Sequence, residues 1–202
     1  MGHMFTTPLA PVVLSDAHVR LEPIEARHLP GLQAIAGDPQ IWTWMPMDGG
    51  QPGAMDVLVR QAVGAREAAR ELPFVVHLAE TGQIVGSTRY LNIQPNDLGL
   101  EIGWTWYARA VWAGAVNPAC KRLLLNHAFE TLGAVRVGLR CDARNTRSAA
   151  AITKLGAVRE GVLRRHKRVQ HGFIRDTVQF SILADEWPAV RDQLDARLDA
   201  HA

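Results

Sequence analysis

The order of elements between residues 98 and 156 constrains the fold of this 202-residue chain more than any other feature. Residues 98 to 107 alternate apolar and polar side chains and are rich in aromatic residues, which predicts a strand. A loop of mostly small residues follows, and residues 118 to 132 have the spacing of an amphipathic helix. A second strand is predicted over residues 135 to 141 and a second helix from about residue 146 to residue 155. This alternation of strands and helices indicates an α/β fold.

The loop at residues 109 to 117 joins the first of these strands to the helix that follows. Asn117 is predicted as the N-cap of that helix, with Pro118 at its first position and Gly133 just after its end. The start of a helix presents backbone N–H groups without an internal partner at the positive end of the helix dipole. The loop therefore predicts a phosphate-binding site. A plain connection between strand and helix is the alternative.

The remaining segments complete one domain, which we assign to residues 5–202, with residues 1–4 interpreted as an expression scar. Further strands are predicted at residues 18 to 24, 74 to 79, 83 to 93, 157 to 169 and 173 to 183, and further helices at residues 25 to 35, 54 to 72 and 184 to 200. Pro73 is predicted to end the second of these helices. Together the elements predict a mixed, mostly antiparallel sheet of about seven strands that is flanked by helices and parallel only near the loop.

Composition and cysteine usage indicate a soluble, cytoplasmic protein without a metal. The apolar fraction of 48% allows a substantial core. The uncharged stretch at residues 102 to 108 is far shorter than the roughly 20 residues that span a bilayer, so no membrane association is expected. Cys120 and Cys141 lie far apart and lack Cys-x-x-Cys spacing. We therefore expect neither a zinc site nor a disulfide.

Five short motifs, in a fixed order along the chain, resemble those of one family. They are residues 100 to 104 (Leu-Glu-Ile-Gly-Trp), the loop at 109 to 114, residues 145 to 148 (Asn-Thr-Arg-Ser), residues 154 to 156 (Lys-Leu-Gly) and residues 159 to 161 (Arg-Glu-Gly). Their order resembles the GNAT superfamily of acyl-CoA-dependent N-acyltransferases. Within it, the chain is most similar to the branch of the RimJ and RimL ribosomal-protein N-terminal acetyltransferases. The resemblance covers roughly residues 17 to 187.

The resemblance implies an enzyme that transfers an acetyl group from acetyl-CoA to a primary amine by direct attack, without a covalent intermediate. A protein or peptide N-terminal α-amine is the first expectation for the acceptor. A small-molecule amine, such as an amino acid or antibiotic, is the second. The resemblance also implies a GNAT fold with splayed central strands and the pantetheine arm of the coenzyme in the gap. A noncatalytic module that binds coenzyme A or associates with RNA is the alternative of another class.

The family's phosphate loop is written Gln/Arg-x-x-Gly-x-Gly/Ala, and this chain departs from it at one position. Arg109 and Gly114 match, but Trp112 stands where the first glycine is expected. We expect Trp112 to keep an ordinary backbone conformation with its indole turned aside; otherwise the loop would bind phosphate poorly. The resemblance implies contacts with the coenzyme from Ile102, Trp104, Arg109, Trp112, Ala113, Gly114, Ala115, Val116, Asn117 and Asn145.

Two side chains are candidates for the proton transfers that such a reaction needs. Glu101 lies near the middle of its predicted strand and is the candidate base, acting directly or through a water. A glutamate paired with a neighbouring arginine is the alternative. Many members of the family carry a tyrosine as the acid where this chain has Ile152. Ser148 resembles the serine suggested for this role in the RimL-type branch, and an ordinary helix residue is the alternative.

Aromatic and basic residues outside these motifs indicate the acceptor side. Trp42 and Trp44 form either part of the core or a wall of the acceptor pocket. His166 lies on the hairpin where the family admits substrates, and plain solvent exposure is the alternative. Eleven basic and two acidic residues lie between residues 135 and 175. They could hold the phosphates of coenzyme A, contact RNA or an acidic protein, or be solvated surface. Nucleic acid is expected as a partner only in a ribosomal context, and a homodimer is possible.

Overall fold

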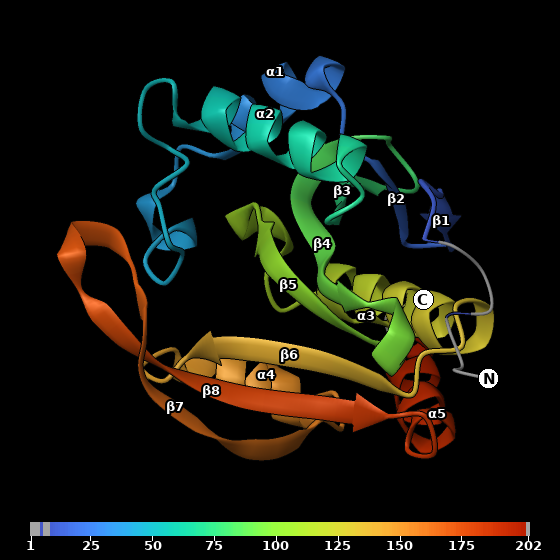
Figure 1. Ribbon diagram of the computed structural model, residues 1–202. Coiled ribbons are helices and arrows are strands. Elements are labelled where there is room, and N and C mark those ends of the chain that lie inside the picture. The colour runs from blue at the N-terminus through green and yellow to red at the C-terminus, as the bar shows by residue number, and fades with distance from the viewer. Residues whose placement is uncertain (1–4, 6–8, 201–202) are drawn as a thin grey trace.

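The chain forms an eight-stranded sheet with helices on both faces, as a computed structural model shows for residue 5 and residues 9–200 (Figure 1). The predicted scar at residues 1–4 lies outside the described residues. The strands are β1 Leu14–Ser15, β2 Val19–Pro23, β3 Leu72–Leu78, β4 Ile84–Gln94, β5 Gly99–Tyr107, β6 Arg136–Asp142, β7 Val158–Arg168 and β8 Ile174–Leu183. The α-helices are α1 Leu29–Ile35, α2 Ala54–Glu67, α3 Val116–Asn126, α4 Thr146–Lys154 and α5 Trp187–Asp199. The prediction of about seven strands missed β1, whose two residues are too few to show an alternating pattern.

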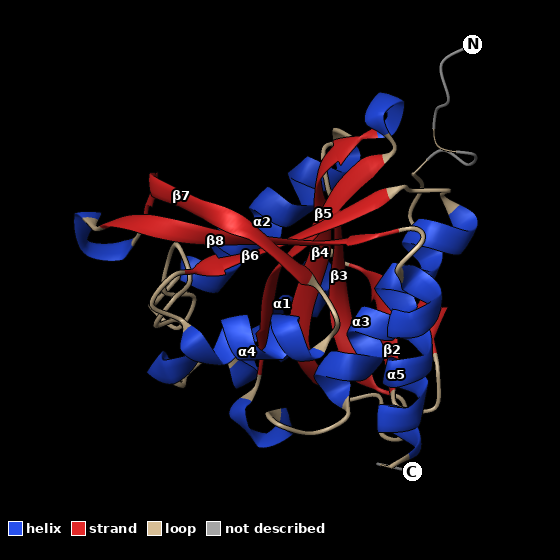
Figure 2. Cartoon of the chain, turned by 90° about the horizontal axis from the view of Figure 1, so that it is seen from below, coloured by secondary structure: helices blue, strands red, loops and turns tan. Residues whose placement is uncertain are grey.

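The sheet divides into two halves between β5 and β6. Its strand order is β1-β2-β3-β4-β5-β6-β8-β7, and all neighbours are antiparallel except β5 and β6. These two pair in parallel only from Gly99 with Arg136 to Glu101 with Gly138. Beyond Glu101 the strands diverge, and Figure 2 shows β6, β8 and β7 fanning away from β5, β4 and β3. The predicted splayed, mixed sheet is therefore confirmed.

Helices on the two faces of the sheet enclose separate cores. Helices α1 and α2 pack on β4 and β3, and one core cluster between them includes Leu32 and Leu58. On the other face, α3 packs against α5 and the larger cluster includes Leu124 and Leu194 (Figures 1 and 2). Each fully buried leucine contributes about 2 kcal/mol through removal of apolar surface from water. Helix α4 lies against β6, so helices support both strands that border the gap.

The boundaries of two predicted helices need correction. Helix α2 ends at Glu67 because Ala69 takes a left-handed conformation (φ 52°), so Pro73 lies inside β3 and does not end the helix. Helix α3 begins at Val116 with Ala115 as its N-cap, so the prediction of Asn117 as N-cap is wrong. It runs into a π-helical turn at His127–Thr131, after which Gly133 adopts the expected positive φ of 73°.

Two smaller predictions concern the cysteines and the membrane. Both cysteines are buried free thiols. Among the described residues, no helix combines the length and the apolar character needed to cross a bilayer.

Candidate functional site

A β-bulge distorts β5 where it borders the gap. Ser87 of β4 pairs with Trp106 and Arg89 pairs with Gly103, so one residue of β4 faces two of β5. At the bulge, Trp104 has a positive φ of 50°, which is rare for a bulky side chain. The Arg89 guanidinium lies 4.9 Å from the centroid of its indole. Because a bulge takes one residue out of the hydrogen-bonded ladder, it makes backbone polar groups of β5 accessible from the gap.

The loop before α3 keeps the geometry of an anion site despite its tryptophan. Trp112 has an ordinary extended conformation (φ −68°, ψ 148°), as expected, and the left-handed position falls on Ala113 (φ 62°). No side chain caps the start of α3 at Ala115. The first N–H groups of this helix therefore remain available as donors at the positive end of its dipole.

The indole of Trp112 is turned back onto the protein and flanked by two arginines. Its Nε1 donates to the carbonyl oxygen of Tyr107 at 2.9 Å. The guanidinium carbons of Arg109 and Arg147 lie 5.2 and 3.7 Å from the ring centroid. Burial lowers the pKa of Arg147, and the nearby charge of Arg109 lowers it further. Two cations thus lie close to each other beside the loop, which suits a ligand with more than one negative charge.

Glu101 sits where the pairing of β5 with β6 ends. Its carboxylate forms an ion pair with Arg140 and accepts a hydrogen bond from Asn92 Nδ2 at 2.8 Å. The side chain crosses directly over Gly138, where an added Cβ would lie only 2.8 Å from its Cγ. Glu101 is therefore paired with a neighbouring arginine, which is the alternative to its role as a base. The pairing holds a carboxylate at the mouth of the gap, and the role of Glu101 as a base stays a prediction.

Asn145 and Ser148 lie at the start of α4, on the β6 side of the gap. Asn145 is the N-cap, and its Oδ1 accepts a hydrogen bond from the backbone N–H of Ser148 at 3.0 Å. Only the amide NH₂ of Asn145 remains free for a ligand. Burial raises the pKa of the Cys141 thiol, and a hydrogen bond with the Ser148 hydroxyl opposes that shift. The predicted roles of Asn145 and Ser148 remain untested by these contacts.

The two tryptophans predicted near the acceptor have different environments. Trp42 is 1% exposed, donates from Nε1 to the carbonyl oxygen of Ala36 at 2.8 Å and lies 4.8 Å from the ring of Trp106. It belongs to the core, so an acceptor has no access to its side chain in this structure. Trp44 is partly exposed and stacks on the guanidinium of Arg144 at 4.9 Å.

The tip of the β7–β8 hairpin meets the segment that carries these tryptophans. Gln170 Nε2 donates to the backbone carbonyls of Trp42 at 2.7 Å and Met45 at 2.8 Å. Phe173 also contacts Arg144, with the guanidinium carbon 3.8 Å from the ring centroid. Sequence reasoning missed Gln170, Phe173 and Arg144. No local pattern marks contacts between residues that lie so far apart along the chain.

His166 lies on β7 within an irregular stretch of its pairing with β8. Its Nδ1 is 3.0 Å from Thr177 Oγ1. Partial burial lowers the pKa of His166, and the charges of Arg140 and Arg175 lower it further. The neutral form of the ring is therefore favoured. His166 lies on the same side of this half of the sheet as the Glu101–Arg140 pair. Its predicted contact with the acceptor is compatible with this position.

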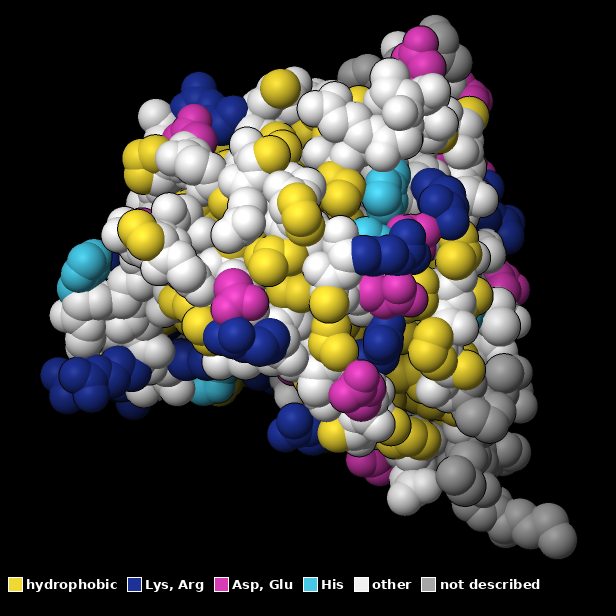
Figure 3. Space-filling view, turned by 90° about the horizontal axis from the view of Figure 1, so that it is seen from above, with side chains coloured by type: hydrophobic (Ala, Val, Ile, Leu, Met, Phe, Trp, Pro, Cys, Tyr) yellow, Lys and Arg dark blue, Asp and Glu magenta, His cyan; other side chains and the backbone are white. Residues whose placement is uncertain are grey.

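The outer surface of the hairpin carries the basic residues noted in the sequence. In Figure 3, lysine and arginine side chains gather on the projecting corner at the left, where the β7–β8 hairpin lies. Within the described part of the chain, no carboxylate lies within ion-pair distance of four exposed cations on β7: Arg164, Arg165, Lys167 and Arg168. Partners of either phosphate or carboxylate chemistry are compatible with this surface.

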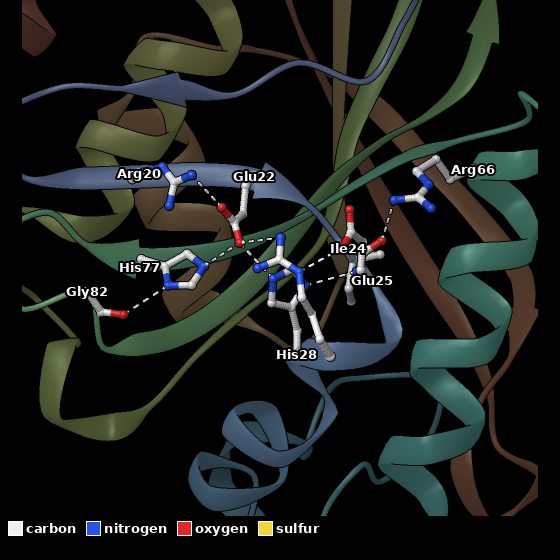
Figure 4. Close-up of polar contacts among 9 residues, drawn as sticks. Arg20, Glu22, Ile24, Glu25, His28, Arg66, His77 and Gly82 are labelled. Atoms are coloured by element: carbon white, nitrogen blue, oxygen red, sulfur yellow. Dashed lines mark hydrogen bonds and ion pairs between the residues drawn. The ribbon is translucent and has the colours of Figure 1, made fainter.

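One cluster outside the gap has the composition of a metal site. The potential ligand atoms of Glu22, His28 and His77 lie within 4.8 Å of one another (Figure 4). However, the backbone N–H of Glu25 donates to His28 Nδ1 at 2.9 Å, which places the proton of the neutral ring on Nε2. That Nε2 donates to Glu22 at 2.7 Å, and Arg20 pairs with the same carboxylate at 2.7 Å. His28 has no free lone pair for a metal, so we interpret the cluster as a structural network.

Comparison with known proteins assigns this chain to a protein family. Residues 18–158 match the family model described as "Acetyltransferase (GNAT) domain". The chain therefore belongs to the GNAT acetyltransferase domain family, as the motifs predicted.

The individual relatives include proteins that are named as N-acetyltransferases. It is 30% identical over 106 residues to the "Putative ribosomal N-acetyltransferase YdaF" of Bacillus subtilis (strain 168), a match that covers 52% of this chain and 57% of the relative. A GCN5-related N-acetyltransferase from Brucella melitensis has a TM-score of 0.88 at 25% identity, covering 96% of this chain and 88% of its own. Mycobacterium smegmatis RimJ, solved in complex with CoA-disulfide, has a TM-score of 0.78 at 25% identity, covering 94% of this chain and 95% of its own.

Proposed function

We propose that this chain is an acetyl-CoA-dependent N-acetyltransferase whose acceptor is the α-amine at the N-terminus of a protein or peptide. The gap between β5 and β6 is the observation that carries the proposal. Strand edges without a partner line both of its sides, and an extended arm such as pantetheine can pair with them as a strand would. The uncapped start of α3, with Arg109 and Arg147 beside it, offers donors and positive charge for the diphosphate.

Side chains and backbone around the gap would perform direct transfer as follows. Backbone N–H groups at the bulge near Trp104 polarise the thioester carbonyl. Glu101, held by Arg140 and Asn92, accepts the ammonium proton directly or through a water. The neutral amine attacks the carbonyl carbon and the carbon–sulfur bond breaks. Ser148 passes its proton to the departing thiolate and regains one from the attacking nitrogen, which becomes the amide nitrogen.

The relatives favour a protein acceptor over a small-molecule amine. YdaF is named as a putative ribosomal N-acetyltransferase, and RimJ was solved in complex with CoA-disulfide. The face of β6 and β8 that carries Arg140, Gln179 and Thr177 would be the surface on which an extended acceptor lies. Such a surface accommodates a chain that enters by its terminus.

The test is acetylation of synthetic peptides with free N-termini by the purified chain, with release of free thiol as the readout. We expect turnover with α-amines, little with N-terminally blocked peptides that carry an internal lysine, and product mass placed on the first residue. The Glu101→Gln variant should lower kcat/KM at least about 100-fold, because a general base contributes about 100-fold or more.

The matched control is Glu160→Gln, which removes another glutamate paired with an arginine, Arg136, on the same sheet half but away from the gap. It should retain activity. If the protein binds coenzyme A but releases no thiol with any peptide, the protein acceptor is rejected. If only small-molecule amines are acetylated, the second expectation from the sequence replaces the first.

A further inference from the structure

Arg175 on β8 is a partly buried cation without an acidic partner. Its Nε donates to Thr177 Oγ1 at 3.0 Å, and within the described part of the chain no carboxylate lies within ion-pair distance of its guanidinium. The nearest acidic influence is Asp142, but Arg144 already occupies both oxygens of that carboxylate, at 2.9 and 2.7 Å. The two terminal nitrogens of Arg175 are therefore free to donate.

This arrangement is electrostatically costly in the absence of an anion. Burial lowers the pKa of Arg175; Asp142 opposes the shift, and Arg140 and Arg144 add to it. A partly desolvated charge that is surrounded by like charges is destabilising unless a counter-ion compensates it. Such uncompensated groups occur preferentially at binding sites.

His166 adds a further donor next to Arg175. Thr177 Oγ1 accepts from Arg175 Nε and lies 3.0 Å from His166 Nδ1; in the tautomer with an unprotonated Nδ1, the hydroxyl donates to that nitrogen. The neutral ring then carries its proton on Nε2. This part of the β7–β8 hairpin consequently presents the Nη groups of Arg175 and one imidazole N–H. All of these groups are donors, and such a set matches a carboxylate.

The position of Arg175 along the sheet restricts where that carboxylate can be on an acceptor. Glu101 is level with Gly138, whereas Thr177 is level with Asp142, four residues farther along β6. At a rise of about 3.3 Å per residue, the separation along the strand is about 13 Å. The carboxylate of a free amino acid is too close to its amine to span this distance. At the same rise, the fourth residue of an extended peptide lies about 10 Å beyond the first, and an acidic side chain there covers the remaining distance.

We propose that Arg175, with His166 beside it, selects acceptor polypeptides that carry an aspartate or glutamate within the first four residues after the reactive amine. This inference rests on the proposed function and specifies its substrate class. The positive surface of the hairpin would support the same preference at longer range by steering acidic acceptors toward the gap.

The experiment compares kcat/KM for pairs of peptides that differ only by Glu or Gln at positions two, three or four. The wild-type protein should prefer one of the Glu peptides by about 10- to 100-fold, which is the range for a hydrogen bond to a charged group. The Arg175→Met variant should lose this preference, mainly through KM. The Arg175→Glu variant should prefer a peptide with Lys at the same position. Arg197→Met is the matched control, because Arg197 is a partly exposed arginine on α5 that has no ion pair with any described residue.

The outcomes separate this inference from the proposed function. Turnover of all peptides without a Glu preference overturns the role of Arg175 and leaves the acetyltransferase proposal intact. Equally efficient turnover of free glutamate overturns the assignment to a polypeptide. If no peptide is turned over, the proposed function fails, and calorimetric titration with the same peptides decides the role of Arg175: stronger binding of a Glu peptide by wild type than by Arg175→Met supports it, and equal binding overturns it.

Discussion

At the scale of single residues, the most unusual group is the buried cation Lys121 in α3. The residue is 6% exposed, and its Nζ donates to Thr105 Oγ1 at 3.0 Å without a carboxylate in ion-pair distance among the described residues. Burial lowers its pKa from 10.5 to about 8. The unfolded chain thus binds this proton more tightly than the folded chain does. Above pH 10.5 the buried amine is neutral in both states and does not reduce the free energy of unfolding. As the pH falls from 10.5 through about 8, the free energy of unfolding decreases.

Replacing Lys121 with methionine should therefore stabilise the protein at pH 7. The expected gain in the free energy of unfolding is about 2 kcal/mol, because removal of the desolvation cost outweighs the lost hydrogen bond to Thr105. Urea unfolding at pH 7 and pH 9.5 measures it: stability of the wild type should rise between these values and that of Lys121→Met should not. Lys154→Met, which changes an exposed lysine in the last turn of α4, is the control. A loss of stability in Lys121→Met at pH 7 contradicts the prediction.

At the scale of elements, one side chain connects the β7–β8 hairpin to the segment before α2. Gln170 spans the two through its hydrogen bonds to the carbonyls of Trp42 and Met45, and the stack of Trp44, Arg144 and Phe173 lies beside it. The hairpin otherwise projects from the sheet, and nearly all residues of β7 are exposed. These contacts therefore set the distance between the hairpin and the segment before α2, which are the two sides of the proposed acceptor surface.

The variant Gln170→Ala should loosen this connection without affecting the loop before α3, where we propose that coenzyme A binds. Loss of two neutral hydrogen bonds weakens the contact by up to about 2 kcal/mol, so KM for a peptide acceptor should rise up to about 30-fold. The affinity for coenzyme A, measured by calorimetry, should not change. Gln61→Ala on the exposed side of α2 serves as the comparison. An equal effect on coenzyme and peptide would show that the hairpin contact supports the whole domain and not the acceptor surface.

At the scale of the whole molecule, the buried network around Glu22 makes stability depend on pH. Burial lowers the pKa of His28 from 6.5, and the hydrogen bond to Glu22 opposes this shift without cancelling it. Burial acts to raise the pKa of Glu22, but the hydrogen bond from His28 and the charge of Arg20 prevail, so that it is lowered from 4.5. Both groups bind protons less readily in the folded chain. The free energy of unfolding should therefore decrease as the pH is lowered, first below 6.5 through His28 and then below 4.5 through Glu22.

The variant His28→Ala tests this dependence. At pH 8 it should lower the free energy of unfolding by about 1–3 kcal/mol, since it removes the partner of the Glu25 N–H and one of the hydrogen-bond donors to the Glu22 carboxylate. It should also flatten the decline of stability just below pH 6.5, as measured by urea unfolding across that range. His18→Ala provides the comparison, because His18 is partly exposed and outside the network. A decline as steep as that of the wild type would assign the pH dependence to other groups.

Local patterns by themselves determined the family, the mixed α/β fold and the position of the loop before α3. Periodicity places strands and helices because a strand or helix buries one face, and the motifs at residues 100 to 104 and 145 to 148 mark the two sides of the gap. The exact ends of the helices and strands were harder to predict from these patterns. Left-handed conformations at Ala69 and Ala113, and the N-cap at Ala115, arise at residues with no intrinsic preference for them.

Only the tertiary structure decided which side chains share the gap. It placed Trp42 in the core and Trp44 on Arg144, paired Glu101 with Arg140, and left Arg175 without an acidic partner among the residues that the structure describes. These outcomes depend on the register between strands and on contacts between segments more than 100 residues apart, such as Gln170 with Trp42. A one-dimensional pattern reports which face of an element is buried. It carries no information about which other element covers that face, and the chemistry of the site depends on that second fact.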